Sequence, residues 1–177
     1  MKAVFLDRDG VINVDVAYLY ETCNFQWVKH ANEAISYLTK EGYTVFVVTN
    51  QSGIARGYYT EGQMKVLHDF IKSEALKKGG KIEKFYYCPH YKDGKIKEFA
   101  IDCDCRKPKP GMILKAMEEY DIDKENSFLI GDKPGDKEAA EAAGIDGYLF
   151  TTGNKGGSLL SFVEEILAAR KAKEIKG

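Results

Sequence analysis

The sequence predicts an α/β fold of three layers, with helices on both faces of a doubly wound parallel sheet. Short apolar runs alternate with helical patterns along the 177 residues, which is typical of βαβ units. Most runs are continuously apolar and rich in Val, Ile and Phe, as in strands that are buried on both faces. The length suits one domain with a substantial core, so we predict a single domain over residues 1–177.

Five runs are predicted to form the strands of this sheet. Four are mainly apolar, and the one at residues 82–88 alternates more between apolar and polar side chains. Right-handed crossovers place the carboxyl ends of parallel strands along one edge, where such sheets bind ligands. The runs cover residues 3–7, 44–50, 82–88, 127–132 and 147–150.

Helical patterns connect or follow these runs, at residues 30–42, 60–80, 109–122, 134–145 and 159–173. Gly42 and the pair Gly79-Gly80 predict the ends of the first two helices, and Thr60 predicts an N-cap. A proline near the start of the third and fourth helices fits a first helical turn. The Gly-rich segment 151–158 is predicted to be a turn, because it lacks P-loop spacing. The expected apolar stripes are Ala31, Ala34, Ile35 and Leu38 in the first helix and Met64, Leu67, Phe70, Ile71 and Leu76 in the second.

The composition argues against several classes of function. Lys plus Arg number 26 and Asp plus Glu number 27, so no basic excess indicates a nucleic-acid partner. No apolar stretch is long enough to span a membrane, and the N-terminal residues lack the pattern of a secretory signal. We therefore predict a cytoplasmic monomer with a small-molecule substrate, whose four cysteines stay reduced and are candidates for metal binding or packing.

Acidic side chains follow two of the predicted strands. Asp7 and Asp9 leave the first strand, and Asp132 ends the fourth. Carboxylates gathered at one edge repel one another unless a cation is present, and Mg²⁺ prefers a few carboxylates, waters and a substrate phosphate. One carboxylate can then attack phosphorus while a second transfers the protons. Thr49 and Lys107 would supply a hydroxyl donor and a positive charge for the oxygens in transfer.

Four short motifs resemble the ordered motifs of the haloacid dehalogenase (HAD) superfamily. They are DRDGV at residues 7–11, TNQSG at 49–53, a lysine at 107 and GDKPGD at 131–136. The resemblance implies a phosphatase in which Asp7 is the nucleophile and Asp9 the general acid and base. It implies that Thr49 and Lys107 hold the phosphoryl group. The implied Mg²⁺ ligands are Asp7, Asp132 and the main-chain carbonyl of Asp9, with Asp136 orienting the site.

Residues 86–110 predict a zinc-binding loop. Cys88 and His90 form one close pair and Cys103 and Cys105 another, with twelve residues between them. Four protein ligands leave no open position, so the zinc is expected to be structural and to pin a loop with little apolar surface. Reduced cysteines packed in a core are the alternative, which the polar flanks KDGKIKE and DCDCRK disfavour. Cys23 lies outside this set and is expected to pack as a small apolar residue.

Two cations, Arg106 and Lys107, directly follow the last zinc ligand. Zinc binding by the loop would fix both cations beside the edge of the sheet that carries Asp7, Asp9 and Asp132. Because the guanidinium fork matches phosphate geometry, we expect one cation to face the phosphoryl group in transfer and the other a second anionic group of the substrate.

The combined pattern resembles the D-glycero-D-manno-heptose 1,7-bisphosphate 7-phosphatases within this superfamily. The matching segments are FLDRDGVIN, NFQWV, TNQSGIARGYYTE, C-x-H…C-x-C-R-K-P-x-P-G-M and GDK, over about residues 2–153. The resemblance implies removal of the 7-phosphate in lipopolysaccharide-core or nucleotide-heptose precursor synthesis, without a large cap domain. The chain departs from the pattern at Ala17, where that family often has Gly. The implied substrate-binding residues are Asp15, Val16, Ala17, Tyr18, Thr49, Asn50, Gln51, Ser52, Arg106, Lys107 and Lys133.

Three alternatives remain open from the sequence. Histidinol-phosphate phosphatases share the D-x-D motif and the zinc loop, but their substrate offers Arg106 an ammonium group instead of a second anion. A phosphoacceptor switch is disfavoured because an acid/base at Asp9 would hasten hydrolysis of the acyl phosphate. A zinc-stapled binding module without turnover would leave Asp7 and Asp9 without a purpose.

Overall fold

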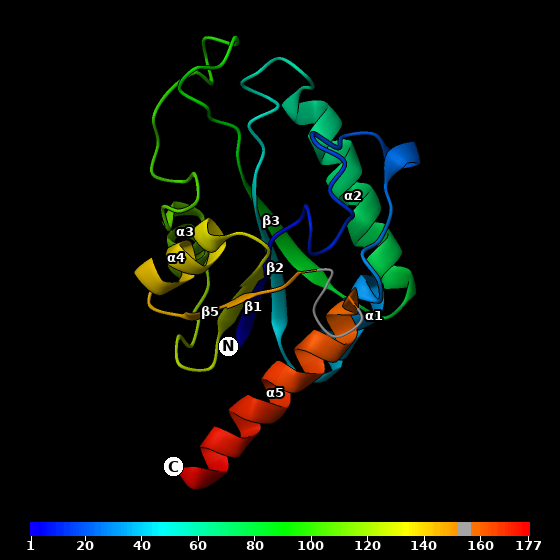
Figure 1. Cartoon of the computed structure of the whole chain (residues 1–177), viewed down its shortest axis with the longest axis vertical. Helices are drawn as coiled ribbons and strands as arrows, with labels where there is room; N and C mark the ends of the chain where they lie inside the picture. Colours follow the sequence, from blue (N-terminus) through cyan, green and yellow to red (C-terminus); the bar gives the residue numbers. More distant parts are fainter. Residues whose placement is uncertain (152–156) are drawn as a thin grey trace.

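Five parallel strands form the sheet on which the molecule is built. The computed structural model describes residues 1–151 and 157–177, and its strand order is β3-β2-β1-β4-β5 (Figure 1). The order reverses between β1 and β4, and such a switch point is where doubly wound sheets bind ligands. The predicted α/β fold and its five strands are confirmed as β1 (Ala3–Leu6), β2 (Thr44–Asn50), β3 (Ile82–Cys88), β4 (Phe128–Gly131) and β5 (Asp146–Leu149).

The helices cover both faces of the sheet, as three layers require. Successive side chains of a strand point to opposite faces, so Val4 and Leu6 pack in one hydrophobic cluster and Ala3 and Phe5 in the other. The first cluster includes side chains of α1, α2 and α5, and the second those of α3 and α4 (Figure 1). The helices are α1 (Ala31–Lys40), α2 (Glu61–Lys77), α3 (Gly111–Glu119), α4 (Pro134–Ala142) and α5 (Leu159–Lys176).

The helix ends follow the predicted signals. Thr60 caps α2 by accepting a hydrogen bond from the Gln63 amide at 3.1 Å, and Gln63 Oε1 accepts one from the Thr60 amide at 2.9 Å. Gly42 and Gly79 lie just beyond α1 and α2 with φ of +84° and +83°, the left-handed conformation that ends many helices.

The predicted apolar stripe of α2 is wrong at one residue. Leu76 is 66% exposed, and Ala75 occupies the buried position instead. The stripe runs through Met64, Leu67 and Ile71, so the next position on the same face is four residues after Ile71, not five.

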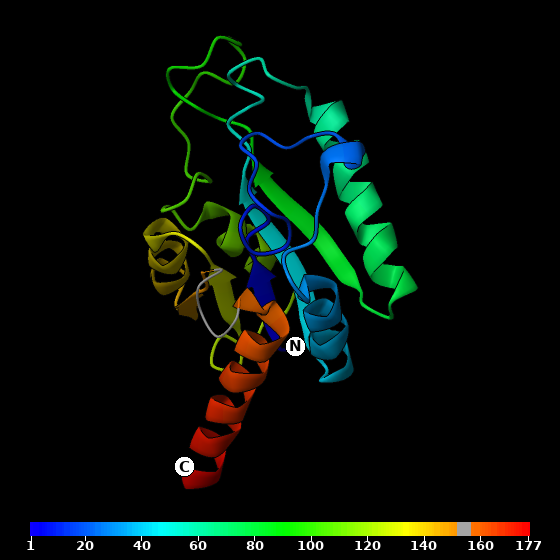
Figure 2. The same cartoon turned by 45° about the vertical axis from the view of Figure 1, so that its right-hand side comes forward.

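Three connecting segments rise above the carboxyl edge of the sheet. They are the segment between β1 and α1, the one between β2 and α2, and the one between β3 and α3 (Figure 2). The first includes a short 3₁₀ helix, Thr22–Asn24, that the sequence did not predict. No separate cap domain interrupts residues 1–151 or 157–177, as expected. These segments therefore lie over the polar side chains at the strand ends.

Cys23 lies in that 3₁₀ helix and is exposed, so the expectation that it packs in the interior is wrong. The helix has no buried residue, because the segment lies on the surface before the chain enters α1.

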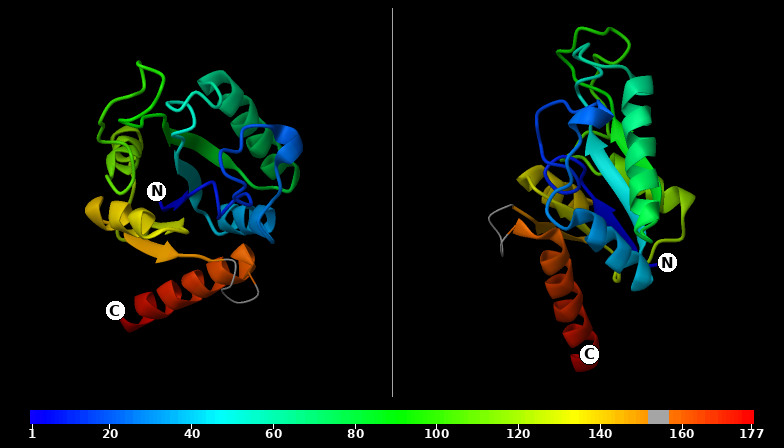
Figure 3. Two further views of the ribbon diagram at one scale, coloured as in Figure 1. Left: turned by 45° about the horizontal axis from the view of Figure 1, so that its top comes forward. Right: turned by 90° about the vertical axis from the view of Figure 1, so that its right-hand side faces the viewer.

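The apolar side chains that the C-terminal helix buries all lie in its first half. Leu159, Val163, Ile166 and Leu167 are buried against the sheet side, whereas residues 171–177 are exposed and extend beyond the rest of the molecule (Figure 3). None of the helices in the described part of the chain combines the length and apolar character needed to cross a bilayer. The turn predicted at residues 151–158 falls largely on residues 152–156, which lie outside the described residues.

Candidate active site

The acidic edge forms where β1 and β4 lie side by side. The Asp7 amide donates to the Ile130 carbonyl at 3.0 Å, which continues the ladder between these strands by one residue. Asp7 thereby lies beside Asp132, which directly follows β4. Carboxylate oxygens of Asp7, Asp132 and Asp136 all lie within 4.8 Å of one another. The parallel sheet thus brings together the acids that the sequence placed at its edge.

Gly10 is required by the close approach of the first turn to Asp132. Its φ is +87°, and a β-carbon built on it would lie 2.2 Å from Asp132 Oδ2. Any side chain at this position would therefore displace the Asp132 carboxylate as well as strain the backbone.

Lys107 neutralises part of this acidic cluster. Its ammonium lies 2.9 Å from Asp7 Oδ1 and 2.6 Å from Asp136 Oδ1, and it donates to the Val48 carbonyl at 2.9 Å. Burial lowers the pKa of Lys107, but the two carboxylates raise it more, so it remains above its usual value. Burial raises the pKa of Asp7, although the Lys107 ammonium opposes that shift. One cation shared by buried carboxylates leaves negative charge that a divalent ion can balance.

The backbone of Lys107 is fastened to the end of β2. The Asn50 side chain donates to the Lys107 carbonyl at 3.2 Å and accepts from the Lys107 amide at 3.0 Å. This reciprocal pair occupies the amide of Asn50, a residue the sequence assigned to substrate binding. The contact fixes where the lysine leaves its loop, and Asn50 also lines the cavity above the edge.

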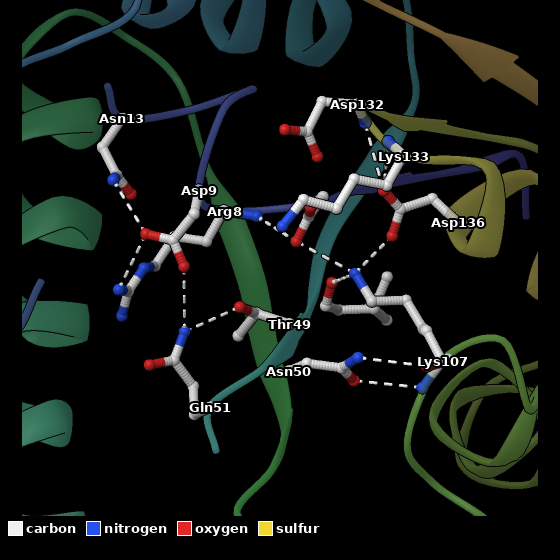
Figure 4. Close-up of polar contacts among 12 residues, drawn as sticks. Arg8, Asp9, Asn13, Thr49, Asn50, Gln51, Lys107, Asp132, Lys133 and Asp136 are labelled. Carbon is white, nitrogen blue, oxygen red and sulfur yellow. Dashed lines mark hydrogen bonds and ion pairs between the residues drawn. The ribbon is translucent and has the colours of Figure 1, made fainter. Parts of the chain in front are cut away.

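Asp9 lies apart from Asp132 and Asp136, and its carboxylate accepts hydrogen bonds from three side chains (Figure 4). Its Oδ1 accepts from Arg8 Nη2 and from Asn13 Nδ2, both at 3.0 Å. Its Oδ2 accepts from Gln51 Nε2 at 3.3 Å, and the same Gln51 nitrogen donates to Thr49 Oγ1 at 2.8 Å. The network connects Asp9 to Thr49 through Gln51.

The donor set at the edge fits a hard divalent cation. Asp132 Oδ1 is buried and has no hydrogen-bond partner among the described residues, and burial raises the pKa of Asp132. Asp136 has both oxygens occupied, since Oδ1 pairs with Lys107 and Oδ2 accepts from the Asp132 and Lys133 amides at 3.1 Å. Asp7 and Asp132 therefore have the oxygens available for Mg²⁺, and Asp136 lies where an orienting residue would.

A cavity of about 480 Å³ opens above this edge. Of the predicted substrate residues, Thr49 is buried beneath it and Val16 is 53% exposed, and neither lines it. Arg56 and Tyr59 line it although the sequence did not indicate them. The predicted residues that line it are Asp7, Asp9, Asp15, Ala17, Tyr18, Asn50, Gln51, Ser52, Arg106, Lys107, Lys133 and Asp136.

Arg56 and Arg106 meet at one aromatic ring. The guanidinium carbon of Arg56 lies 3.9 Å from the centre of the Tyr91 ring, and that of Arg106 lies 5.7 Å from it. The three residues come from two separate loops, so no motif spacing could have indicated that Arg56 turns towards Arg106. The cavity therefore has a second positively charged part besides Lys107, formed by Arg56 and Arg106, which we call the cationic corner.

The departure at Ala17 falls on a strained backbone position. Ala17 and Tyr18 both have φ of +59°, a conformation that Gly adopts more readily than Ala. Asp15 Oδ1 accepts a hydrogen bond from the Ala17 amide at 3.0 Å and holds this turn at the rim of the cavity.

The Cys₃His cluster fits a tetrahedral zinc site. Zn–S bonds of about 2.3 Å and Zn–N bonds of about 2.1 Å place sulfurs about 3.8 Å apart and sulfur and nitrogen about 3.6 Å apart. Cys103 Sγ lies 3.5 Å from the sulfurs of Cys88 and Cys105, and His90 Nδ1 lies 3.6 Å from Cys88 Sγ and 3.4 Å from Cys105 Sγ. The four residues predicted from the sequence are therefore consistent with a zinc site.

Replacing Cys103 with Ser should lower the free energy of unfolding by at least about 2 kcal/mol and reduce activity with it. The loop that leads to Arg106 and Lys107 would lose a ligand and its fixed path. Urea unfolding with and without a chelator measures the effect. Cys23→Ser is the matched control, since Cys23 is exposed and outside the cluster. A Cys103→Ser protein that binds one zinc and unfolds like the wild type would contradict the assignment.

Comparisons with known proteins agree with this geometry. A family model described as "HAD-hyrolase-like" matches residues 104–171. The D-glycero-beta-D-manno-heptose-1,7-bisphosphate 7-phosphatase of Pasteurella multocida is 46% identical over 81% of this chain and 78% of its own length. The D-glycero-alpha-D-manno-heptose-1,7-bisphosphate 7-phosphatase of Photorhabdus laumondii is 45% identical over 82% of this chain and 79% of its own.

A solved structure is similar over almost the whole length. The D,D-heptose 1,7-bisphosphate phosphatase of B. bronchiseptica, complexed with magnesium and phosphate, superposes with a TM-score of 0.81 at 31% identity. The match covers 96% of this chain and 99% of that one. The chain therefore belongs to the D-glycero-D-manno-heptose-1,7-bisphosphate 7-phosphatase family of HAD-like hydrolases.

Proposed function

We propose that the protein is a Mg²⁺-dependent phosphatase that removes the 7-phosphate from D-glycero-D-manno-heptose 1,7-bisphosphate. The observation that carries the proposal is the cluster of Asp7, Asp132 and Lys107 at the strand ends, of which Asp7 and Lys107 line the cavity, in a chain of this family. The product would serve lipopolysaccharide-core or nucleotide-heptose precursor synthesis in the cytoplasm. We propose that the enzyme acts as a monomer, with zinc in a structural role.

The roles of the residues follow from their contacts. A bound Mg²⁺ would hold a phosphate oxygen and balance the charge of Asp7 and Asp132. Lys107 Nζ and the Arg8 amide both donate to Asp7 Oδ1, at 2.9 and 2.8 Å, and so fix the direction of the nucleophilic carboxylate. Thr49 Oγ1 accepts a hydrogen bond from Gln51. The hydroxyl proton of Thr49 is therefore free to be donated to an oxygen of the phosphoryl group.

The reaction proceeds in two displacements at phosphorus. Asp7 forms a bond to phosphorus while the bond to the C7 oxygen breaks, and Asp9 gives its proton to that leaving oxygen. Asp9 then takes a proton from water as the water oxygen attacks the aspartyl phosphate. Inorganic phosphate leaves, and Asp7 returns to a free carboxylate. One water molecule is thereby consumed to hydrolyse the ester, and Asp7 and Asp9 return to the states in which they began.

The cationic corner supports a bisphosphate as substrate. Arg106 and Arg56 lie at the Tyr91 ring, on the wall of the same cavity that exposes Asp7 at its floor. A second phosphate would meet these guanidinium groups while the first lies at Asp7. Histidinol phosphate would bring an ammonium group to the same corner, where two cations repel it.

The test is kinetics on the alpha and beta anomers of heptose 1,7-bisphosphate and on histidinol phosphate. We expect kcat/KM to be higher for one or both bisphosphate anomers than for histidinol phosphate. Comparing the anomers also assigns the configuration at C1, which differs between the two relatives. A preference for histidinol phosphate would overturn the substrate and leave the phosphatase mechanism intact.

Replacing Arg106 with Ala should lower kcat/KM on the bisphosphate by about 10- to 100-fold, because a charge-assisted contact to the second anion is lost. The loss on p-nitrophenyl phosphate, which has no second anion, should be less than about threefold. Arg106→Lys keeps the charge without the fork and should lie between these values. Equal losses on the two substrates would mean that Arg106 does not contact the second anion.

A further inference from the structure

We infer that His68, on α2 and outside the cavity, is a positioning residue for the reaction. It holds the Arg8 guanidinium, which orients the Asp9 carboxylate so that Oδ2 of Asp9 transfers the proton. This inference rests on the proposed function, because it assigns one atom to the acid/base role of Asp9. His68 belongs to none of the motifs that indicated the active site.

The contact between His68 and Arg8 is buried and has a defined direction. His68 is 5% exposed and Arg8 is 0% exposed, and Nε2 of His68 lies 3.1 Å from Nη1 of Arg8. A guanidinium group only donates hydrogen bonds, so Nε2 must accept and must carry no proton. Burial lowers the pKa of His68 well below its usual value, and the Arg8 charge lowers it further. His68 is therefore neutral, with its proton on Nδ1.

The imidazole ring is itself fixed by the sheet. It stacks on Phe85 of β3 with ring centres 4.3 Å apart and an interplanar angle of 15°. This stacking limits rotation of the ring, so the position of Nε2 is set by two packed elements. The sheet thus defines where the guanidinium of Arg8 can lie.

His68 matters because Arg8 has few other contacts to hold it. Arg8 Nη2 donates to Asp9 Oδ1 at 3.0 Å and to the Leu19 carbonyl at 2.8 Å. Its Nε has no hydrogen-bond partner among the described residues. His68 is the acceptor that the described part of the chain offers to Nη1. Without that acceptor, the buried guanidinium would keep an unsatisfied donor and could turn away from Asp9.

The orientation decides which oxygen of Asp9 can carry a proton. Oδ1 accepts from Arg8 and Asn13, both at 3.0 Å, so its lone pairs are occupied. Among the described residues, Oδ2 has one donor, Gln51, at the longer distance of 3.3 Å, and Asp9 lines the cavity. A carboxylate group rotates easily about its terminal torsion. The hydrogen bonds that Arg8 and Asn13 donate to Oδ1 therefore hold the group so that Oδ2 stays available for proton transfer.

Two His68 variants separate positioning from packing. His68→Leu removes the acceptor, whereas His68→Gln offers a side-chain oxygen near the place of Nε2. The readout is kcat/KM on heptose 1,7-bisphosphate and on p-nitrophenyl phosphate, whose leaving group departs as an anion without a proton. Because kcat/KM reports the step up to phosphoryl transfer, only the sugar ester requires the acid at that stage. We expect His68→Leu to shift the ratio of the two values about tenfold against the sugar ester, and His68→Gln to restore most of it.

Asp9→Asn calibrates this readout. It should shift the same ratio in the same direction by more than His68→Leu does, because it removes the acid itself. If Asp9→Asn shows the shift and a folded His68→Leu loses equally on both substrates, the inference fails and the proposed function stands. The inference would also be overturned if a folded His68→Gln protein shifted the ratio of the two kcat/KM values as far against the sugar ester as His68→Leu does. Absence of phosphate release by the wild-type enzyme would overturn the proposed function together with the inference.

The wild-type protein gives an independent check should His68→Leu not fold. Nitrogen-15 NMR of the histidine rings should show His68 with an unprotonated Nε2 and a protonated Nδ1 at neutral pH. A proton on Nε2 would exclude the hydrogen bond from Arg8 and overturn the inference.

Discussion

Replacing Asp7 with Asn is expected to abolish phosphate release, with a fall in kcat of at least about 10⁴-fold. The amide is nearly the same size as the carboxylate but cannot attack phosphorus. It would also weaken the pairing with Lys107, which lies 2.9 Å from Asp7 Oδ1. Steady-state phosphate release from the bisphosphate measures the effect, and phosphorus labelling should show no covalent adduct on the variant.

Asp69→Asn provides the control for this prediction, since Asp69 is exposed on α2 and should tolerate the same change. Full activity of the Asp7→Asn protein would end the proposal of a covalent enzyme. A labelled wild-type adduct that persists for minutes would instead favour the phosphoacceptor switch.

Replacing Lys107 with Met is expected to have the second largest effect, on both activity and stability. The variant loses the cation that we propose faces the phosphoryl group, which should lower kcat by about 10²- to 10³-fold. It also leaves Asp7 and Asp136 buried without their shared partner, a change that costs about 3–5 kcal/mol when one member of a buried ion pair is removed. Urea unfolding of the metal-free protein and phosphate release measure the two effects.

The stability loss of Lys107→Met should depend on pH. Burial raises the pKa of Asp7, and the variant removes the ammonium that lowers it, so the folded state holds its proton to higher pH than the unfolded chain does. The folded state is then favoured below the unfolded pKa of about 4, and that contribution is lost as pH rises. The wild-type Asp7 pKa is already raised to about 8, so the two proteins lose this contribution alike up to that pH. The penalty should therefore be smaller at about pH 6 than at about pH 9.

Lys115→Met is the matched control, because Lys115 is exposed on α3. It should leave both activity and the pH dependence of unfolding unchanged. A Lys107→Met protein as stable as the wild type at both pH values would show that the cation does not compensate the buried acids.

The sequence was sufficient to predict the fold and the close approach of the acidic residues at the sheet edge, for one physical reason. Parallel strands place their carboxyl ends on the same edge, so residues that directly follow buried strands must lie close together. Asp7 and Asp132 are such residues. The Cys₃His cluster was predictable because structural zinc sites take four ligands of particular types at short spacing.

The contacts that tie the loops to the sheet could not be predicted in the same way. The Asn50 side chain meets the backbone of Lys107, and Arg56 meets the ring of Tyr91, because the segments after β2 and β3 cover the same edge. Neither contact repeats with a period or forms a motif. The errors at Leu76 and Cys23 have a related origin, since helix phase and surface placement depend on the neighbours that a segment acquires on folding.

The reciprocal bonds between Asn50 and Lys107 and the pairing of β1 with β4 have a consequence for synthesis on the ribosome. Lys107 is made a hundred residues after Asp7, the proposed nucleophile, and Asp132 and Asp136 come later still. A nascent chain therefore has no complete site until β4 and the first turn of α4 have left the exit tunnel. Hydrolysis of cellular phosphate esters cannot begin on a half-made polypeptide, and a product truncated before β4 would be chemically inert.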